Sequence, residues 1–224
     1  LLKNGEHIES LKILEKIYIY SKDYKNAYFI AEKLFNIQQN PENLIELINI
    51  SSLKNDLEKI KSFENSELLN DKVLYAIAKA YYENNKSEDA KENLKKALNI
   101  NPDNEDALVL LGKIYFDENE FEKSKNIFNT FSKTSENPEV LNYLGLFALE
   151  DMKFIDAIKY FSKASSLSKQ NPRYFYNLGN AYFYNGWFKE AIQAYLQAIC
   201  MAPENSGYRY SLAYLYFEQK NFDK

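Results

Sequence analysis

The sequence predicts an all-α fold in which antiparallel helix pairs stack into a solenoid. First, one pattern of apolar and small residues recurs at intervals of 30 to 34 residues along the 224-residue chain. Second, the apolar residues within each copy follow the spacing of a helical face. Third, Gly, Asn and Pro recur where each copy would turn between helices or begin a new one.

The recurring pattern is centred on a leucine or isoleucine. The central residues are Leu14, Leu47, Ile77, Leu111, Leu144, Leu178 and Leu212. The residue that follows is small in most copies, as in Ala78, Gly112, Gly145, Gly179 and Ala213. The residue four positions after the centre is aromatic in Tyr18, Tyr81, Tyr115, Tyr182 and Tyr216. So many coincidences at one period indicate a repeat protein, in which each copy contacts its neighbours.

Each copy is expected to form two short helices. In the copy at 172–205, the first helical face consists of Phe175, Leu178, Gly179 and Tyr182. The first helix is expected to end near Gly186. The second face consists of Phe188, Ala191, Ile192, Tyr195, Ala198 and Ile199. Asn caps helices and Pro suits the first helical position, so helix starts are predicted at Asn40-Pro41, Asn137-Pro138 and Asn171-Pro172.

This pattern resembles the tetratricopeptide repeat (TPR) family, whose unit of about 34 residues reads W-x2-L-G-x2-Y, then A-x3-F, then P. The best copy reads Phe175-x2-Leu178-Gly179-x2-Tyr182, followed by Ala191-x3-Tyr195, Ala198 and Pro203. Phe replaces the family's Trp, and Tyr replaces its Phe. The resemblance covers nearly the whole chain and implies a right-handed TPR superhelix.

The chain is expected to be a single array over 1–224. Its copies are 8–40, 41–70, 71–104, 105–137, 138–171 and 172–205, with a partial copy at 206–224. The copy at 41–70 is degenerate, because Ile48 occupies the small position and Ser51 the aromatic one. Residues 62–70 are expected to form a shortened helix and a local irregularity. Because the chain lacks an initiator Met and stops within a copy, we expect a fragment of a longer protein.

Composition and charge disfavour several classes of function. The formal net charge of −4 argues against a nucleic-acid partner. No apolar run approaches the ~18 residues of a membrane span, and the start lacks the apolar core of a signal peptide. The single Cys permits no internal disulfide. The cytoplasm is the location expected by default, although targeting signals can lie outside a fragment.

No catalytic, metal or cofactor site is expected. His7 is expected at the surface or at a helix start. Cys200 follows apolar residues late in a second helix and is expected to be a buried, inert thiol. The charged segment KENLKK at 91–96 is expected to be a solvated helix face. Trp187 lies at a turn between helices, where it either covers the turn or contacts a partner.

In the TPR family the first helices line a concave groove, so the resemblance implies which residues face a partner. The candidate residues are Lys79, Lys113, Tyr143, Arg173, Tyr176, Asn177, Asn180, Tyr184, Tyr210 and Tyr214. They belong to a second helical stripe, which one helix cannot bury together with its core stripe against the same neighbour. The groove is expected to be aromatic toward the C-terminus and of mixed charge toward the middle. Its aromatic residues either bind a partner or pack on adjacent repeats, and both alternatives stay open.

Two specialised TPR functions are disfavoured. The clamp that holds the C-terminal carboxylate of heat-shock proteins is not assembled, because Tyr176 and Leu146 stand where it needs other residues. The Asn ladder of glycosyltransferase repeats is also missing. The first hypothesis is therefore a non-catalytic scaffold that binds a peptide or helix of another protein. The alternatives are a substrate-recruiting or targeting arm of a larger enzyme, whose catalytic domain lies outside this chain, and a self-assembling solenoid that forms homo-oligomers through its ends.

Overall fold

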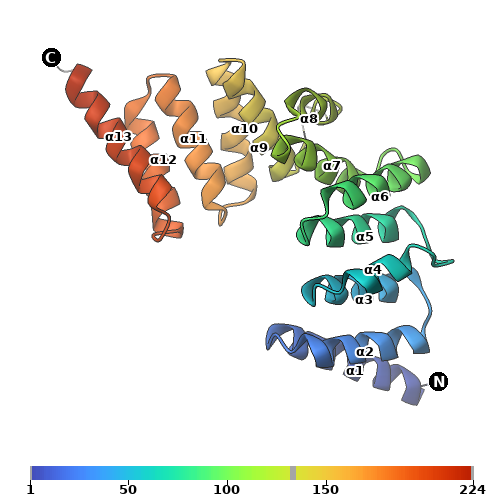
Figure 1. Cartoon of the computed structure of the whole chain (residues 1–224). Coiled ribbons are helices and arrows are strands. Elements are labelled where there is room, and N and C mark those ends of the chain that lie inside the picture. The colour runs from blue at the N-terminus through green and yellow to red at the C-terminus, as the bar shows by residue number, and fades with distance from the viewer. Residues whose placement is uncertain (1, 132–134, 223–224) are drawn as a thin grey trace. The chain divides into compact units, whose positions relative to one another are not determined.

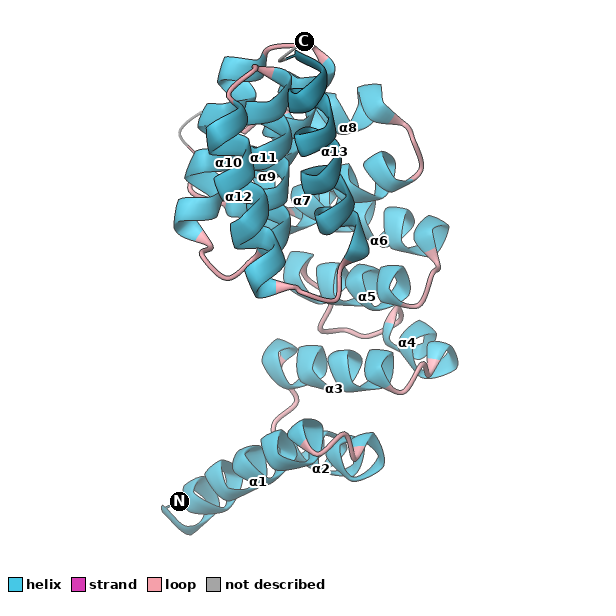
Figure 2. Ribbon diagram, turned by 90° about the vertical axis from the view of Figure 1, so that its left-hand side faces the viewer, coloured by secondary structure: helices cyan, strands magenta, loops and turns pink. Residues whose placement is uncertain are grey.

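The computed structural model describes residues 2–131 and 135–222, and over these residues the protein consists of thirteen α-helices joined by short turns (Figure 1). In the same ranges it contains no strand (Figure 2). The predicted all-α fold is therefore confirmed. The chain divides into two compact units, residues 1–120 and 121–224, which are described separately.

The first unit consists of helix pairs and one further first helix. Its helices are α1 (Leu2–Tyr20), α2 (Tyr24–Ile37), α3 (Pro41–Leu53), α4 (Leu57–Phe63), α5 (Asp71–Glu83), α6 (Ser87–Ile100) and α7 (Glu105–Asp117). Helices α1 and α2 pack together, as do α5 and α6, and each pair also contacts the next first helix.

The second unit repeats this arrangement. Its helices are α8 (Phe121–Phe128), α9 (Pro138–Glu150), α10 (Phe154–Leu167), α11 (Pro172–Tyr184), α12 (Phe188–Met201) and α13 (Ser206–Phe222). Helix α9 packs on α10 and α11 on α12, while α13 packs on α12.

The Asn-Pro pairs start first helices as predicted. Asn40, Asn137 and Asn171 are N-caps whose side chains accept backbone hydrogen bonds, and Pro follows each at the first helical position. Asn70 and Asn104 cap α5 and α7 in the same way. Capping by Asn satisfies backbone N–H groups that a helix start otherwise leaves without partners.

Every turn inside a helix pair contains one residue with positive φ, which is the fifteenth residue of its copy. The six residues are Lys22, Asn55, Asn85, Asn119, Met152 and Gly186. Asn tolerates this left-handed conformation better than most residues, and Gly adopts it without strain. Lys22 and Met152 therefore keep a strained backbone because the two packed helices require this turn.

The two helices of a pair approach closely where a glycine faces an aromatic ring. A Cβ placed on Gly145 would lie 2.6 Å from Cε1 of Phe161, and one placed on Gly179 would lie 2.6 Å from Cε1 of Tyr195. Both rings are almost fully buried. The small residue of the repeat therefore makes room for the aromatic residue of the second helix.

Adjacent copies are also joined by ion pairs at equivalent places. Lys91 Nζ lies 2.8 Å from Oε2 of Glu118, and Lys125 Nζ lies 2.7 Å from Oδ1 of Asp151. Lys91 is only 8% exposed, so the prediction that 91–96 is a solvated face was wrong at this residue. Its hydrogen bonds to the carboxylates of Glu118 and Glu88 raise the pKa of Lys91, so the buried amine stays charged.

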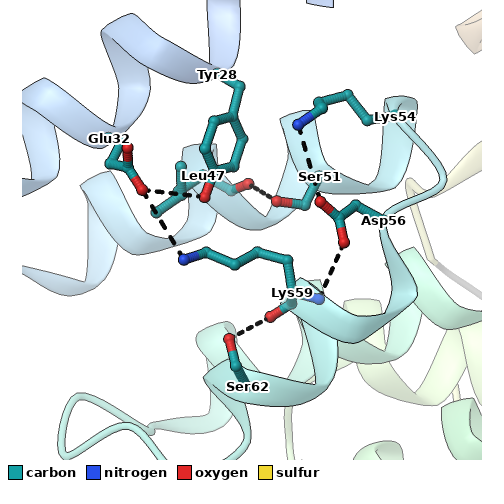
Figure 3. Close-up of polar contacts among 8 residues, drawn as sticks. All are labelled: Tyr28, Glu32, Leu47, Ser51, Lys54, Asp56, Lys59 and Ser62. Atoms are coloured by element: carbon teal, nitrogen blue, oxygen red, sulfur yellow. Dashed lines mark hydrogen bonds and ion pairs between the residues drawn. The ribbon is translucent and has the colours of Figure 1, made fainter. Parts of the chain in front are cut away.

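The shortened helix expected at 62–70 lies earlier in the degenerate copy, because α4 spans Leu57–Phe63 and has only seven residues. Ser51 stands at the aromatic position, is fully buried and donates a 2.8 Å hydrogen bond to the carbonyl oxygen of Leu47 (Figure 3). Residues 64–70 form turns and loop. The copy at 105–137 also has a short second helix, α8 with eight residues, which was not predicted.

Helix α2 contacts the degenerate copy through Tyr28 and Glu32. The ammonium group of Lys54 lies 4.1 Å from the centre of the Tyr28 ring, and the Tyr28 hydroxyl donates to Oε1 of Glu32 at 3.2 Å (Figure 3). Lys59 Nζ lies 3.9 Å from the same Glu32 oxygen. These contacts connect α2 to the end of α3 and to α4.

The structure places the three residues for which the sequence predicted burial or exposure. His7 is exposed, as predicted. Cys200 is exposed, so its predicted burial was wrong, because it lies two residues after the buried Ala198 and on another side of α12. Trp187 precedes α12, is 46% exposed and lies against Tyr182 with a ring distance of 5.9 Å, so it partly covers the turn.

Over the described residues, none of the helices combines the length and the apolar character needed to cross a membrane.

The strained turn residue predicts a stabilising substitution. Met152 has φ 57° and its side chain is 75% exposed, so Met152→Gly removes backbone strain without removing a core contact. We expect the free energy of unfolding to rise by about 0.5–1 kcal/mol, measured by urea denaturation. The matched control is Gly186→Ala, where φ is 80° and no atom lies within 4 Å of the new Cβ. It should destabilise by a similar amount, and equal stability of both variants and the wild type would contradict the interpretation.

Candidate functional site

A second stripe of side chains runs along the first helices of the second unit, beside the stripe that packs into the core. On α11 it contains Tyr176, Asn180 and Tyr184, which are spaced four residues apart, and on α13 it contains Tyr210 and Tyr214. Residues four apart lie on the same face of a helix. We call these five residues the tyrosine surface.

Three residues of the tyrosine surface are largely open to solvent. Tyr184 is 61% exposed, Tyr210 72% and Tyr214 45%. The rings of Tyr210 and Tyr214 are stacked with centres 6.5 Å apart. Tyr214 also lies 6.0 Å from the ring of Phe183, which connects the part of the surface on α13 to the part on α11. The result is a continuous aromatic patch across two helices.

Tyr176 has a packing role. Its ring lies 4.8 Å from that of Tyr208 and 5.8 Å from that of Tyr195, and its hydroxyl is 3.2 Å from Oγ of Ser211. Its side chain is half-buried between α11, α12 and α13. Both alternatives for the groove aromatics therefore have an example here: Tyr176 packs on the neighbouring helices, whereas Tyr184 and Tyr210 remain mostly exposed.

Asn180 is oriented by a buried tyrosine. The hydroxyl of Tyr195, which is 2% exposed, donates a 2.7 Å hydrogen bond to Oδ1 of Asn180. The preceding copy has Phe161 at the equivalent position, which carries no hydroxyl and cannot make this bond. The bond fixes which side of the amide faces inward. Nδ2 of Asn180 then makes no hydrogen bond with the described residues and is free to donate.

Two tyrosine hydroxyls at this surface have a raised pKa. Burial raises the pKa of Tyr195, and the hydrogen bond with the carboxylate of Glu218 raises the pKa of Tyr214. Both groups therefore remain hydrogen-bond donors at any physiological pH. Arg173 lies at the start of α11, is exposed, and forms no ion pair with the residues that the structure describes.

Two candidate contact residues lie inside the helix stack. Tyr143 is 1% exposed, and its ring stacks on that of Phe128 with centres 4.4 Å apart. Asn177 is 6% exposed, and its Nδ2 donates a 2.7 Å hydrogen bond to Oδ1 of the buried Asn142. The expectation that both face an open groove was therefore wrong, because neighbouring helices cover this edge of the stripe.

The candidate lysines belong to the first unit. Lys79 lines a cavity of about 520 Å³ whose walls also include Asn49, Asp71, Lys72, Tyr75 and Asp106. Its Nζ lies 3.9 Å from Oε1 of Glu83. Lys113 Nζ lies 5.3 Å from the centre of the Tyr82 ring, and the Tyr82 hydroxyl donates to Asp117 at 2.6 Å. This part of the stripe has mixed charge, as predicted.

Among the described residues, no three His, Cys, Asp or Glu side chains gather as a metal ion would require. The sequence interpretation missed the bond between Tyr195 and Asn180. A signal was available, because a tyrosine replaces phenylalanine at a core position and a buried hydroxyl needs a partner.

Three models of one repeat family match the sequence. A model described as TPR repeat matches 78–119, and two models described as tetratricopeptide repeat match 105–137 and 176–224. No curated protein matches the sequence.

Solved structures of repeat proteins match most of the chain. The APC/C hetero-tetramer Cut9-Hcn1 contains a chain with 18% identity and a TM-score of 0.53; the match covers 94% of this chain and 49% of that one. This chain thus spans about half the length of its match. The C-terminal part of a TPR repeat-containing protein from Cytophaga hutchinsonii matches with 16% identity and a TM-score of 0.58, covering 93% and 88%.

A third match is YrrB, described as a TPR protein with an unusual peptide-binding site. Its identity is 18% and its TM-score 0.59, with 81% of this chain and 96% of YrrB covered. At these identities the structural matches establish the fold. The three sequence matches, over 78–119, 105–137 and 176–224, show that this chain belongs to the tetratricopeptide repeat family.

Proposed function

We propose that this protein is a non-catalytic interaction scaffold and that the tyrosine surface binds an extended segment of another protein. The tetratricopeptide repeats and the structural matches support the general role of a protein-interaction scaffold. The specific proposal is carried by one observation: the exposed rings of Tyr210 and Tyr214 are stacked, and Phe183 connects them to the exposed ring of Tyr184.

The chemistry of the surface fits a peptide with apolar side chains. Tyrosine offers a large contact area and has few rotatable bonds to immobilise, which is why it is frequent at interaction hot spots. Between the rings, Nδ2 of Asn180 can donate a hydrogen bond to a backbone carbonyl of the bound segment. The bond from Tyr195 holds the amide in this orientation before binding, which lowers the entropic cost.

The rings are also arranged before any partner arrives. The ring of Phe183 contacts both exposed tyrosines. Its centre lies 6.0 Å from the centre of the Tyr214 ring and 5.5 Å from that of the Tyr184 ring. Tyr184 further lies 6.0 Å from Phe154 of α10. Support from half-buried neighbours limits the motion of the exposed rings. YrrB, a TPR protein with an unusual peptide-binding site, adds support from a protein of the same fold.

Truncating two rings should weaken binding and leave the fold intact. We expect Tyr184→Ala combined with Tyr214→Ala to reduce the affinity for a bound peptide by about 1–4 kcal/mol, the range of hot-spot truncations. The ligands would be peptides selected from a displayed random library on the intact chain, and their affinities would be measured by calorimetry. Circular dichroism would check that the variant keeps its helical content and melting temperature.

The matched control is Tyr216→Ala. Tyr216 is 46% exposed, like Tyr214, but lies two residues further along α13 and thus about 200° around the helix. Its removal should leave peptide affinity unchanged. The proposal is wrong if the double variant binds as tightly as the wild type, or if it unfolds while the folded fraction still binds normally. In the latter case the rings belong to the core.

A further prediction concerns the residue that orients Asn180. Tyr195→Phe removes one hydroxyl and should lower the free energy of unfolding by about 0.5–1.5 kcal/mol. It should also weaken peptide binding, although Tyr195 is too buried to contact the peptide. A double-mutant cycle with Asn180→Ala tests the cause: the loss in affinity from Tyr195→Phe should disappear once Asn180 is absent. Additive losses would show that the hydroxyl does not act through the amide.

A further inference from the structure

The copy at 8–40 reverses a size relationship found in the second unit. In the copies at 138–171 and 172–205, a glycine of the first helix faces an aromatic ring of the second, as Gly145 faces Phe161. The equivalent positions in the copy at 8–40 are one and seventeen residues after Leu14 and carry Glu15 and Ala31. A long acidic side chain thus replaces the glycine, and a methyl group replaces the ring.

This exchange leaves a cavity where the ring would otherwise lie. The cavity has a volume of about 260 Å³ and lies between α1, α2 and α3; its walls include Glu15, Lys16, Ala31, Leu34, Asn43 and Glu46. Small-molecule pockets usually have volumes of about 300–1,000 Å³. The space therefore suits one side chain better than a drug-sized ligand. Because Lys16 and Glu46 are exposed, the cavity can be reached from solvent.

Glu15 is the unusual group in this cavity. It is only 6% exposed, and its buried Oε1 has no hydrogen-bond partner among the described residues. A buried carboxylate without a partner is costly, and a positive charge or a donor would relieve that cost. Burial, followed by the nearby carboxylate of Glu46, raises the pKa of Glu15 to about 7, while Lys16 and Lys12 act in the opposite direction.

The neighbouring lysines do not supply this positive charge or donor to Glu15. Lys12 Nζ lies 3.7 Å from Oε1 of Glu9, with its side chain 46% exposed, and Lys16 is exposed. Helix α2 contributes the apolar walls Ala31 and Leu34. The cavity therefore combines an apolar interior, a buried carboxyl group without a partner and a second carboxylate near its rim.

We infer that this cavity receives a cationic side chain, a lysine or arginine of a partner protein, whose charged head group pairs with Glu15 and Glu46. The apolar stem of that side chain contacts Ala31 and Leu34. This site lies in the first unit and does not depend on the tyrosine surface, which belongs to the second. A partner segment with a basic residue is thus recognised by charge at this site.

The test uses butylammonium, which has the stem and head group of lysine, as the probe. Titration into the whole chain should shift the methyl NMR resonances of Ala31 and Leu34 and reach saturation, whereas 1-butanol at the same concentrations should not. The probe stays charged below pH 9, but Glu15 loses its proton as the pH passes about 7. Affinity should therefore rise by about tenfold between pH 6 and pH 8. Lys12, Lys16 and Glu46 are the other charged groups that line the cavity.

Glu15→Gln is the decisive variant, because it keeps the size of the side chain and removes its charge. It should weaken butylammonium binding by about tenfold or more and abolish the pH dependence. Glu42→Gln is the matched control, since Glu42 is exposed and does not line the cavity; it should bind like the wild type. Equal binding of butylammonium and 1-butanol, or unchanged binding by Glu15→Gln, would overturn the inference.

A second variant tests the location. Glu15→Gly combined with Ala31→Phe recreates the pair formed by Gly145 and Phe161 and should fill the cavity with a ring. We expect this variant to have a higher melting temperature and to lose butylammonium binding. Binding with wild-type affinity in the folded variant would place the probe elsewhere and contradict the inference. If this variant fails to fold, the results with Glu15→Gln still decide the question.

Discussion

The close approach of the two helices in each pair is the constraint on which the other features of this protein depend. Where a glycine faces a ring, as Gly179 faces Tyr195, the backbone of one helix contacts an aromatic side chain of the other. This contact determines which face of the first helix is buried within its own pair. The remaining face must be covered by the next copy or stay open to solvent, and the tyrosine surface is the part that stays open.

The same contact explains how one repeat can acquire a site that its neighbours lack. Interiors are close-packed, so changing the size of one member of a contacting pair requires a change in the other. In the copy at 172–205 the ring carries a hydroxyl, and Asn180 accepts its hydrogen bond at the surface. In the copy at 8–40 the ring is missing, and a buried carboxyl group lines the space. Variation at one structural position thus produces two different chemical environments.

The turns and the junctions between copies use equivalent positions in the same way. The positive φ falls on the fifteenth residue of each copy, even where the residue is Lys or Met. Lys91 and Lys125 occupy equivalent positions and reach acidic residues just after the next first helix. In the degenerate copy, Lys54 is equivalent to Glu118 and Asp151, and it lies over the ring of Tyr28, which is equivalent to Lys91 and Lys125. The geometry of the repeat is therefore kept although its interactions change.

The sequence by itself determined the fold, the family and the starts of three first helices. Helical periodicity and Asn-Pro caps act within about ten residues, so they can be recognised without knowledge of neighbouring copies. The tertiary structure alone decided which residues of the second stripe are open. Tyr143 and Tyr184 both belong to that stripe, yet Tyr143 stacks on Phe128 and is buried, whereas Tyr184 is mostly exposed. The burial of Lys91 and the cavity beside Glu15 likewise depend on side chains from other helices. The spacing of residues within one helix does not say how closely the side chains of another helix approach it.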